Sequence, residues 1–171
     1  MILALDTSTD MAAIALYKPD EGVIAEQSWR SGREQTTQLM PNVQRLMSLV
    51  SATSGDLTGV AVAIGPGSFS GVRTALSVGK SLAYALELPI WGVPSLDVLA
   101  YQQVAVTAAQ VCAVLRVGRG RLAWALYRTR GTRWQRLTPY TNSSPQEMAA
   151  AVIQHETNVA TLFCGEIGAD T

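Results

Sequence analysis

The order of strand-like and helical patterns occurs twice along the chain, and this repeat constrains the fold more than any other feature. Between residues 2 and 29, three short apolar runs are separated by turn formers, which is typical of strands joined by tight turns. A helical pattern and a continuous apolar run follow, and such a run is typical of a buried parallel strand. The same order starts again at Val111. The sequence therefore predicts an α/β fold made of two related lobes.

The patterns also predict where the other elements lie. Helices are expected at residues 34–52, 71–86, 95–107 and 144–153, and strands at 60–64, 89–93, 111–117, 122–127, 132–137 and 159–164. Thr36 or Thr37 is a candidate cap for the first helix, which would put Pro41 close to its first turn, where proline is tolerated. Ser95 is the candidate cap of the third helix.

The repeat suggests a division into an N-terminal lobe, residues 1–108, and a partial C-terminal lobe, residues 109–171. The chain finishes on LFCGEIGADT, a strand-like run that meets a glycine turn. Domains seldom finish on a strand that no further element follows, so we expect the second lobe to be truncated.

Composition limits the classes of function. Charged residues make up 15% of the chain, with 13 basic against 13 acidic side chains, which argues against a strongly basic nucleic-acid binder. Cys112 and Cys164 lie far apart in sequence, so a disulfide framework or a cysteine zinc site is not expected. The start lacks a signal-peptide pattern and no long apolar run occurs, which favours a cytoplasmic protein.

Arginine is dense in the strands expected for the second lobe. The residues are Arg116, Arg119, Arg121, Arg128, Arg130, Arg133 and Arg136. They could form a modest RNA-facing patch, but with zero net charge a solvated sheet face is the favoured interpretation.

A glycine-rich segment, AIGPGSFSGVRTAL from Ala63, joins an expected strand to an expected helix. Its glycines are spaced G-x-G-x-x-x-G, which fits neither the dinucleotide fingerprint nor the phosphate-binding P-loop. It is either a tight turn that needs glycine for close packing or an anion site at a helix N-terminus. The turn Asp6–Thr9, DTST, is a second candidate for holding a metal-bound water and phosphate oxygens, although these residue types also simply favour turns.

Small residues recur every fourth position after this loop, at Gly71, Ala75, Gly79 and Ala83. Such a stripe lets another helix approach closely. Glycine inside a helix costs about 1 kcal/mol, so the close approach should matter. The neighbour could be a helix of the same fold or a helix of a partner, and the sequence leaves both open.

Three segments together resemble one family closely. They read LALDTSTDMAAIALY near the start, AIGPGSFSGVRTAL from Ala63, and PIWGVPSLDVLA from Pro89. In this order and spacing they resemble the TsaB (YeaZ) family, the non-catalytic subunit of the bacterial system that forms threonylcarbamoyladenosine in tRNA. The resemblance covers most of residues 1–100. It implies the duplicated actin-like/Hsp70-like ATPase fold, which is ribonuclease H-like.

The family has a catalytic relative, TsaD, once described as a glycoprotease (peptidase M22). The resemblance implies that its His-x-x-x-His metal ligands align with Ser95 and Leu99. Leucine cannot coordinate a metal, and serine rarely does without strong partners. The single histidine, His155, has no second His or Cys nearby in sequence and is interpreted as a surface residue. We therefore expect no metal site, no catalytic residue and no enzymatic activity of this chain alone.

Residual nucleotide binding stays open. The candidate residues are Asp6, Ser8, Gly65, Gly67 and Ser68. ATP or ADP could bind there, although no cofactor is required. The alternative hypothesis is an active ATPase or phosphotransferase of the same fold, with Asp6 near the metal. An M22-type metallopeptidase is a weaker alternative, because the ligands and an HExxH motif are missing.

The resemblance implies a scaffold role. The chain would bind a TsaD homologue, joined by the ATPase subunit TsaE. It would support transfer of a threonylcarbamoyl group to the tRNA adenosine next to the anticodon. In the family the first two long helices make this contact, so the candidate interface residues are Met40, Val43, Met47, Gly71, Ala75, Gly79 and Ala83. We expect a homodimer when the partner is absent, contact with tRNA only through the partner, and no membrane. Gly79→Leu should break association and leave the monomer folded.

Overall fold

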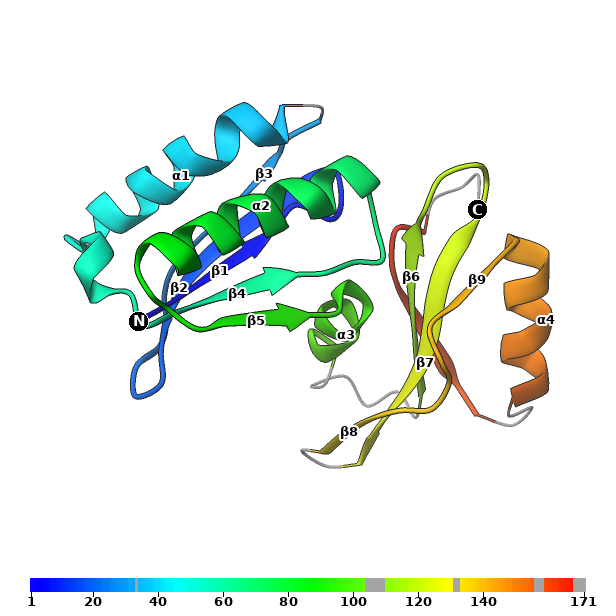
Figure 1. Ribbon diagram of the computed structural model, residues 1–171. Helices are drawn as coiled ribbons and strands as arrows, with labels where there is room; N and C mark the ends of the chain where they lie inside the picture. Colours follow the sequence, from blue (N-terminus) through cyan, green and yellow to red (C-terminus); the bar gives the residue numbers. More distant parts are fainter. Residues whose placement is uncertain (33, 104–109, 131–132, 156–158, 168–171) are drawn as a thin grey trace. The chain divides into compact units, whose positions relative to one another are not determined.

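The chain forms two compact units, Met1–Val93 (unit 1) and Pro94–Thr171 (unit 2). The computed structural model describes all residues except 33, 104–109, 131–132, 156–158 and 168–171 (Figure 1). The predicted lobe boundary between residues 108 and 109 lies outside the described residues, as does the end of the helix predicted at 95–107.

Unit 1 contains a five-stranded sheet in the order β3-β2-β1-β4-β5. Its strands are β1 (Ile2–Asp6), β2 (Met11–Lys18), β3 (Gly22–Arg30), β4 (Gly59–Ala63) and β5 (Ile90–Val93). The first three strands are antiparallel because short turns join them, whereas helical crossovers make β4 parallel to β1 and β5 parallel to β4.

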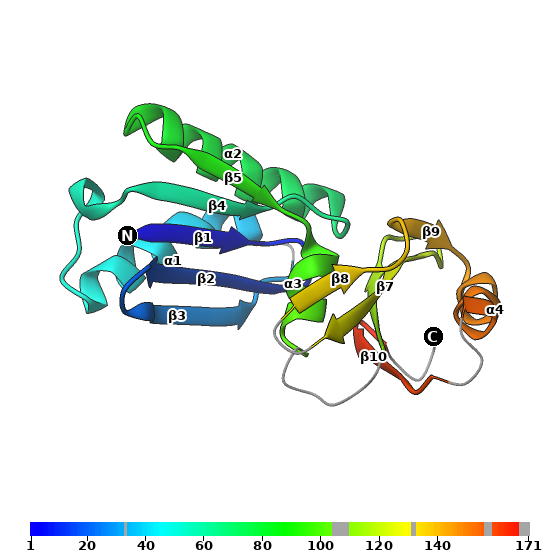
Figure 2. The same cartoon turned by 90° about the horizontal axis from the view of Figure 1, so that it is seen from below.

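Two helices, α1 (Gln35–Leu49) and α2 (Phe69–Ala85), cover one face of this sheet (Figure 1). Seen from below, the sheet lies in front of both helices (Figure 2). Alternate residues of the strands point toward the helices, as the two-residue period of a strand requires. Leu3 and Leu16 of the sheet and Leu39 of α1 are fully buried in this core.

The start of α1 differs from the prediction. The helix begins at Gln35, its N-cap residue is Glu34, and no side chain caps it. Thr36 and Thr37 therefore lie inside the first turn, and Pro41 lies inside the helix rather than near its start. Contacts with β3 hold the helix instead: Trp29 Nε1 donates to Gln38 Oε1 at 2.8 Å, and a second amide pair joins β3 to Asn42.

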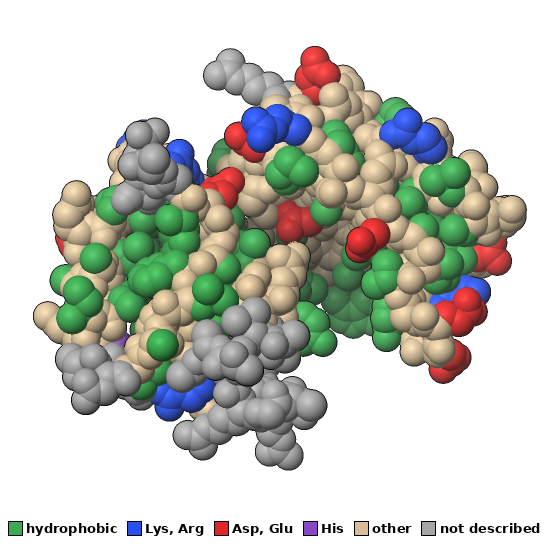
Figure 3. All heavy atoms as spheres, turned by 180° about the vertical axis from the view of Figure 1, so that it is seen from behind, with side chains coloured by type: hydrophobic (Ala, Val, Ile, Leu, Met, Phe, Trp, Pro, Cys, Tyr) green, Lys and Arg blue, Asp and Glu red, His purple; other side chains and the backbone are tan. Residues whose placement is uncertain are grey.

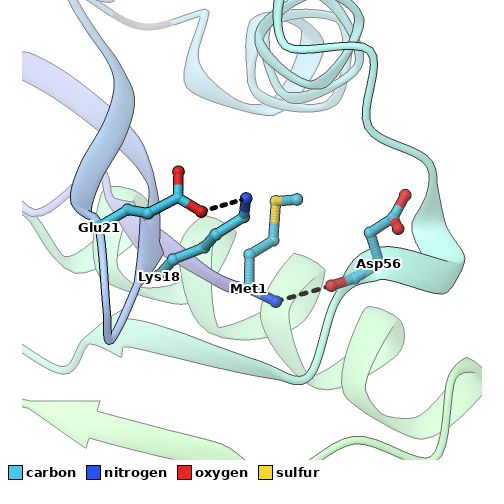
Figure 4. A network of polar contacts seen from close by, with 4 residues as sticks. All are labelled: Met1, Lys18, Glu21 and Asp56. Atoms are coloured by element: carbon cyan, nitrogen blue, oxygen red, sulfur yellow. Dashed lines mark hydrogen bonds and ion pairs between the residues drawn. The ribbon is translucent and has the colours of Figure 1, made fainter.

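The chain start is fixed to the segment that follows α1. The amino group of Met1 donates to the backbone oxygen of Asp56 at 2.7 Å (Figure 4). Asp56 ends the 3-10 helix η1 (Ser54–Asp56), and its carboxylate accepts from the backbone N–H and the hydroxyl of Thr53. These bonds from Thr53 hold the pKa of the Asp56 carboxyl below its usual value. Lys18 and Glu21 pair nearby at 2.7 Å across the β2–β3 turn.

Unit 2 repeats this plan in part. It contains α3 (Ser95–Tyr101), β6 (Gln110–Arg116), β7 (Leu122–Arg130), β8 (Arg133–Arg136), β9 (Thr141–Ser143), α4 (Pro145–His155) and β10 (Thr161–Gly165). The sheet order is β10-β6-β7-β8, with β9 paired to β7. As in unit 1, the first three strands are antiparallel and the strand after the helix is parallel to the first. The predicted α/β repeat is confirmed.

The two helices of unit 2 cover opposite faces of its sheet. Leu96 of α3 packs against the face that contains Ala113 and Tyr127, whereas Met148 of α4 packs against the face that contains Trp124. The residues of β6 from Gln110 to Leu115 are consequently buried on both sides.

Two details of unit 2 differ from the prediction. Ser95 is the first residue of α3, and Pro94 is the N-cap, so Ser95 is not the cap. The short strand β9 was not predicted. The start of α4 at Pro145 is confirmed, with Ser144 and Glu147 exchanging hydrogen bonds around it. None of the helices in the described parts of the chain is long and apolar enough to span a membrane.

Candidate functional site

The β1–β2 turn and the glycine-rich loop before α2 meet at one end of the unit 1 sheet. The hydroxyl of Thr7 donates to the backbone oxygen of Gly71 at 2.6 Å. The backbone N–H of Ser68 donates to the backbone oxygen of Ser8, also at 2.6 Å. The two motifs that the sequence singled out, DTST and GPGSFSG, therefore form one junction.

Close packing explains two of the glycines at this junction. A Cβ on Gly67 would overlap the backbone oxygen of Ser8, and a Cβ on Gly71 would overlap the backbone oxygen of Thr7. Any larger residue would push the turn away from the helix start. Of the two interpretations left open by the sequence, the structure supports the tight turn.

The five candidate nucleotide residues lie around this junction, but several of their polar atoms have internal partners. Asp6 Oδ1 accepts the backbone N–H of Ser8 at 2.7 Å. Ser68 Oγ accepts the backbone N–H of Gly71 at 3.3 Å and so caps α2. Ser8 Oγ is buried and has no hydrogen-bond partner among the described residues. Nucleotide binding by Asp6, Ser8, Gly65, Gly67 and Ser68 stays a prediction.

The stripe of small residues on α2 packs against the sheet of its own unit. Gly71, Ala75, Gly79 and Ala83 are all buried. A Cβ on Gly79 would lie 2.5 Å from Val62 Cγ2, so the helix axis sits close to β4 at this point. The close neighbour is a strand at Gly79 and the β1–β2 turn at Gly71, while Ala75 and Ala83 share a core cluster with residues of α1.

Burial also removes most of the predicted interface residues from the surface. Val43 and Met47 of α1 lie in the core with the α2 stripe, and of the seven only Met40 is half-exposed. The α2 stripe is therefore not open to a partner, whereas Met40, Val43 and Met47 of α1 line a groove, and their contact with a partner stays a prediction.

A groove of about 300 Å³ lies between the C-terminal parts of α1 and α2 and η1. Its lining is mainly apolar: Met40, Val43, Met47, Ala52, Leu57, Leu82 and Leu86, with Gln44, Ser48, Thr53 and Ser54 at the polar positions. Large apolar side chains stand exposed on the same two helices, at Leu49 (73%), Phe69 (76%) and Tyr84 (89%). These exposed residues were not predicted from the sequence, although Phe69 inside a glycine-rich loop was an available signal.

Ser95 and Leu99, the two positions at which the resemblance implied lost metal ligands, lie on α3. Ser95 is buried and its hydroxyl has no partner among the described residues, and Leu99 packs against the α3 face of the unit 2 sheet. Between them, Asp97 accepts hydrogen bonds from Tyr127 Oη at 2.8 Å and Tyr140 Oη at 2.9 Å. Burial, with these bonds, raises the pKa of both phenols.

Ligand sets of other kinds are also missing from the described parts of the chain, where no group of three or more His, Cys, Asp or Glu residues could hold a metal ion. His155 lies exposed at the end of α4. The thiols of Cys112 and Cys164 are free, and burial raises their pKa to about 12 and about 11. Both thiols are therefore protonated near neutral pH, which is unfavourable for a nucleophile.

The strand order of unit 1, and its partial repetition in unit 2, define the class of protein: a duplicated actin-like fold, which is ribonuclease H-like. YeaZ from Pseudomonas aeruginosa has the same fold, with a TM-score of 0.77 and 27% identity over 84% of this chain and 67% of that one. Residues 10–163 match the family model of TsaD, described as tRNA N6-adenosine threonylcarbamoyltransferase.

Curated relatives agree with this match. The TsaB proteins of Escherichia coli and Bacillus subtilis are 32% and 40% identical, over 74% and 58% of this chain. The TsaB of Buchnera aphidicola (subspecies Schizaphis graminum) is 36% identical over 58% of the chain. The chain belongs to the TsaD family and, within it, to its TsaB (YeaZ) members. It spans about half the length of these relatives, 54%, 43% and 47% respectively.

Proposed function

We propose that the chain takes part in the biosynthesis of threonylcarbamoyladenosine in tRNA, as a non-catalytic subunit that binds a TsaD-type catalytic subunit. The names of the relatives, tRNA threonylcarbamoyladenosine biosynthesis protein TsaB, support the pathway. The proposal includes a TsaE-type subunit in the assembly, a homodimer when the partner is absent, and a cytoplasmic location.

The observation that carries the proposal is the outer surface of α1 and α2. It combines a groove of about 300 Å³ with the exposed side chains of Leu49 and Tyr84. Leu49 and Tyr84 belong to the same two helices but do not line the groove, so the groove and these exposed side chains are two separate features of α1 and α2 that each mark an interaction surface. The flexible Met40 and Met47 in the lining can adapt to an inserted side chain. A large aromatic such as Tyr84 is a typical energetic anchor of an interface.

The non-catalytic part of the proposal rests on the chemistry of the site. Leu99 stands where a metal ligand is expected, and Asp97 is engaged by two tyrosines. Asp6 and Ser68 use polar atoms to hold their own turn and helix start.

The test is to mix the chain with the TsaD-type protein of the same organism and measure the mass of the complex by light scattering on a sizing column. A one-to-one complex is expected. The double variant Leu49→Ser/Tyr84→Ser should bind at least about tenfold more weakly, since exposed aromatic anchors account for much of an interface energy. Tyr101→Ser, which removes a tyrosine 68% exposed on α3, is the matched control and should bind normally. Equal binding by both variants would contradict the proposed surface.

A second candidate, an ATPase or phosphotransferase, has one observation in its favour. Ser8 Oγ is buried and unpartnered among the described residues, next to the start of α2. ATP turnover that disappears in Asp6→Asn would support it. Absence of turnover in the parent chain, with intact TsaD binding, would leave the scaffold as the better account.

A further inference from the structure

Strand β3 forms one margin of the unit 1 sheet and is its longest strand, with nine residues and no proline or lysine among them. Figure 2 shows it as the outermost strand of unit 1, next to β2. The strand at the opposite margin, β5, has only four residues. A long edge strand without proline or lysine presents unpaired backbone groups to which another strand can bind. Of the two margins of unit 1, β3 is therefore the one better suited to pair with another chain.

The backbone groups at the free edge of β3 follow from its pairing with β2. In an antiparallel pair, the N–H and C=O groups of alternate residues point toward the same neighbouring strand. The backbone N–H of Ser31 donates at 2.9 Å to Asp10, which directly precedes β2. By alternation, Glu26, Ser28 and Arg30 point away from β2. Their outward backbone groups have no hydrogen-bond partner among the residues that the structure describes.

The same three residues carry their side chains on the sheet face that lies away from α1. Glu26, Ser28 and Arg30 are exposed, whereas Gln27 and Trp29 are half-buried and donate hydrogen bonds to α1. Within the described part of the chain, neither Glu26 nor Arg30 has an ion-pair partner. The two residues lie about 13 Å apart along the strand, too far to pair with each other.

This spacing makes the free edge of β3 complementary to itself. Two copies related by a twofold axis present the same strand to each other, so residue i meets residue j and residue j meets residue i. An antiparallel pair centred on Ser28 puts Ser28 opposite Ser28 of the second copy. It also puts Glu26 opposite Arg30 of the second copy, and Arg30 opposite Glu26 of the second copy. All of these residues point their backbone groups outward, as the hydrogen-bonded pairs of such a ladder require.

Other registers of the same edge lose this match. Centring the pair on Glu26 or on Arg30 places like charges opposite each other, which is destabilising. Centring it halfway between Ser28 and either of them leaves both charges without an opposite charge. Toward the start of β3 there is also a bulge, where Ile24 has no partner in β2. The charges of β3 therefore favour one register.

Charged residues are too sparse for this match to follow from a high density of charge. They make up 15% of the chain, and on the face drawn in Figure 3 acidic and basic side chains lie scattered among apolar ones. The face of β3 toward α1 fits the same register. There, Gln27 of one copy lies opposite Trp29 of the other in a non-hydrogen-bonded pair, in which side chains come closest. The half-buried Trp29 thereby loses further contact with water.

We propose that a second copy of this chain pairs with β3 in this register, so that two five-stranded unit 1 sheets join into one continuous sheet. The proposal gives a surface to the homodimer that the proposed function includes, and to that extent it rests on the proposed function. No residue of β3 lines the groove between α1, α2 and η1. The dimer therefore does not use the groove that is proposed to bind a TsaD-type subunit.

The test measures the mass of the full chain by sedimentation equilibrium at concentrations up to about 0.5 mM, because a small interface associates weakly. The parent chain should form a dimer. Glu26→Arg and Arg30→Glu should each weaken dimerisation at least about tenfold, since each places like charges opposite each other twice. The double variant Glu26→Arg/Arg30→Glu restores both pairs and should return to within about threefold of the parent. A mixture of the two single variants should form a dimer that contains one chain of each.

Ser28→Pro tests the backbone pairing. Because the N–H of Ser28 faces the free edge, proline there removes no bond to β2, but it removes a donor at the centre of the dimer. Dimerisation should weaken at least about tenfold, whereas Ser28→Ala keeps the donor and should behave like the parent. The charge control is Asp20→Arg in the exposed β2–β3 turn, which should also dimerise like the parent. Circular dichroism checks that each variant is folded.

Three results would overturn the proposal. They are a parent chain that stays monomeric throughout, a folded Glu26→Arg or Ser28→Pro variant that dimerises like the parent, and a double charge variant that does not recover. The variant Leu49→Ser/Tyr84→Ser separates this proposal from the proposed function, because it should lose binding to the TsaD-type subunit and still dimerise. Loss of both would assign the dimer to α1 and α2 instead of β3.

Discussion

Gly79 of α2 lies directly against Val62 of β4, with only 2.5 Å between Val62 Cγ2 and the place that a Cβ on Gly79 would occupy. This contact lets the helix sit close to the sheet. It also reverses the expectation for Gly79→Leu, because the added side chain enters the core of unit 1 rather than a partner interface.

Gly79→Ala should lower the free energy of unfolding by about 1–3 kcal/mol, the usual range for overpacking a core. The gain in helix propensity, about 1 kcal/mol, offsets part of this loss. Urea unfolding followed by circular dichroism measures the change. The control is Ser77→Ala on the exposed side of α2, which should leave stability unchanged or slightly raised. A Gly79→Ala variant as stable as Ser77→Ala would contradict this prediction, because it would show that Val62 can move aside at little cost in stability.

Gly71→Ala should be more damaging, with a loss of at least about 2 kcal/mol, because the obstacle is the backbone oxygen of Thr7 rather than the end of a side chain. Gly55→Ala is a matched control. Its Cβ would lie 3.7 Å from the nearest atom, Thr53 Oγ1, so its effect should be within about 0.5 kcal/mol. Thermal melts of the two alanine variants would decide, and equal melting temperatures would contradict the tight junction.

Tyr127 makes stability sensitive to alkaline pH. Burial raises its pKa above the ordinary value of 10.0, and the bond to Asp97 adds to this. Above the unfolded pKa the unfolded chain loses a proton that the folded chain keeps, so stability is complete below about pH 10 and falls as pH rises further. Tyr127→Phe should flatten this alkaline slope, measured by urea midpoints between pH 8 and 11 (a range set by the ordinary phenol pKa, about 10).

The control for that series is Tyr101→Phe, because Tyr101 is exposed on α3 and its loss should not change the slope. An unchanged slope in both variants would assign alkaline unfolding to other groups.

The Asp56 carboxyl should contribute to the pH dependence of stability at acid pH. Hydrogen bonds from Thr53 lower the pKa of Asp56 from 3.8. The stabilisation that the ionised carboxylate contributes is therefore present above about pH 4 and is lost as pH falls through the lowered pKa. Asp56→Asn should remove the corresponding part of the acid slope. Urea midpoints measured downward from pH 5 test this, with the exposed Asp20→Asn as control. Identical acid slopes for the two variants would argue against it.

The element order could be read from the sequence because strand and helix periods differ and turn formers separate them. The bounds of the individual helices and strands were harder to predict. Pro41 suggested a later start for α1, but side-chain contacts from Trp29 to Gln38 stabilise the first turn without a cap. β9 is only three residues long and pairs with β7 through long-range contacts, which no local pattern encodes.

The residues of the candidate site were harder to predict than the fold. Spacing showed that Gly71, Ala75, Gly79 and Ala83 share a helix face, yet spacing does not say what that face meets. Apolar residues on α1 and α2 were assigned to a partner, whereas the sheet buries most of them. The DTST and glycine-loop motifs were singled out separately, and only the folded chain shows that they pack against each other.

The helix α3 follows the last strand of unit 1 in the chain, yet its buried residues Leu96 and Ala100 belong to the core of unit 2. This matters for dividing the protein into fragments. A second-lobe fragment that starts at residue 109 would leave Val111 and Leu115 uncovered by α3, and a first-lobe fragment that ends at residue 108 would carry an apolar helix without its sheet. A cut between Val93 and Pro94 keeps both cores whole, so fragments for binding studies should be made there.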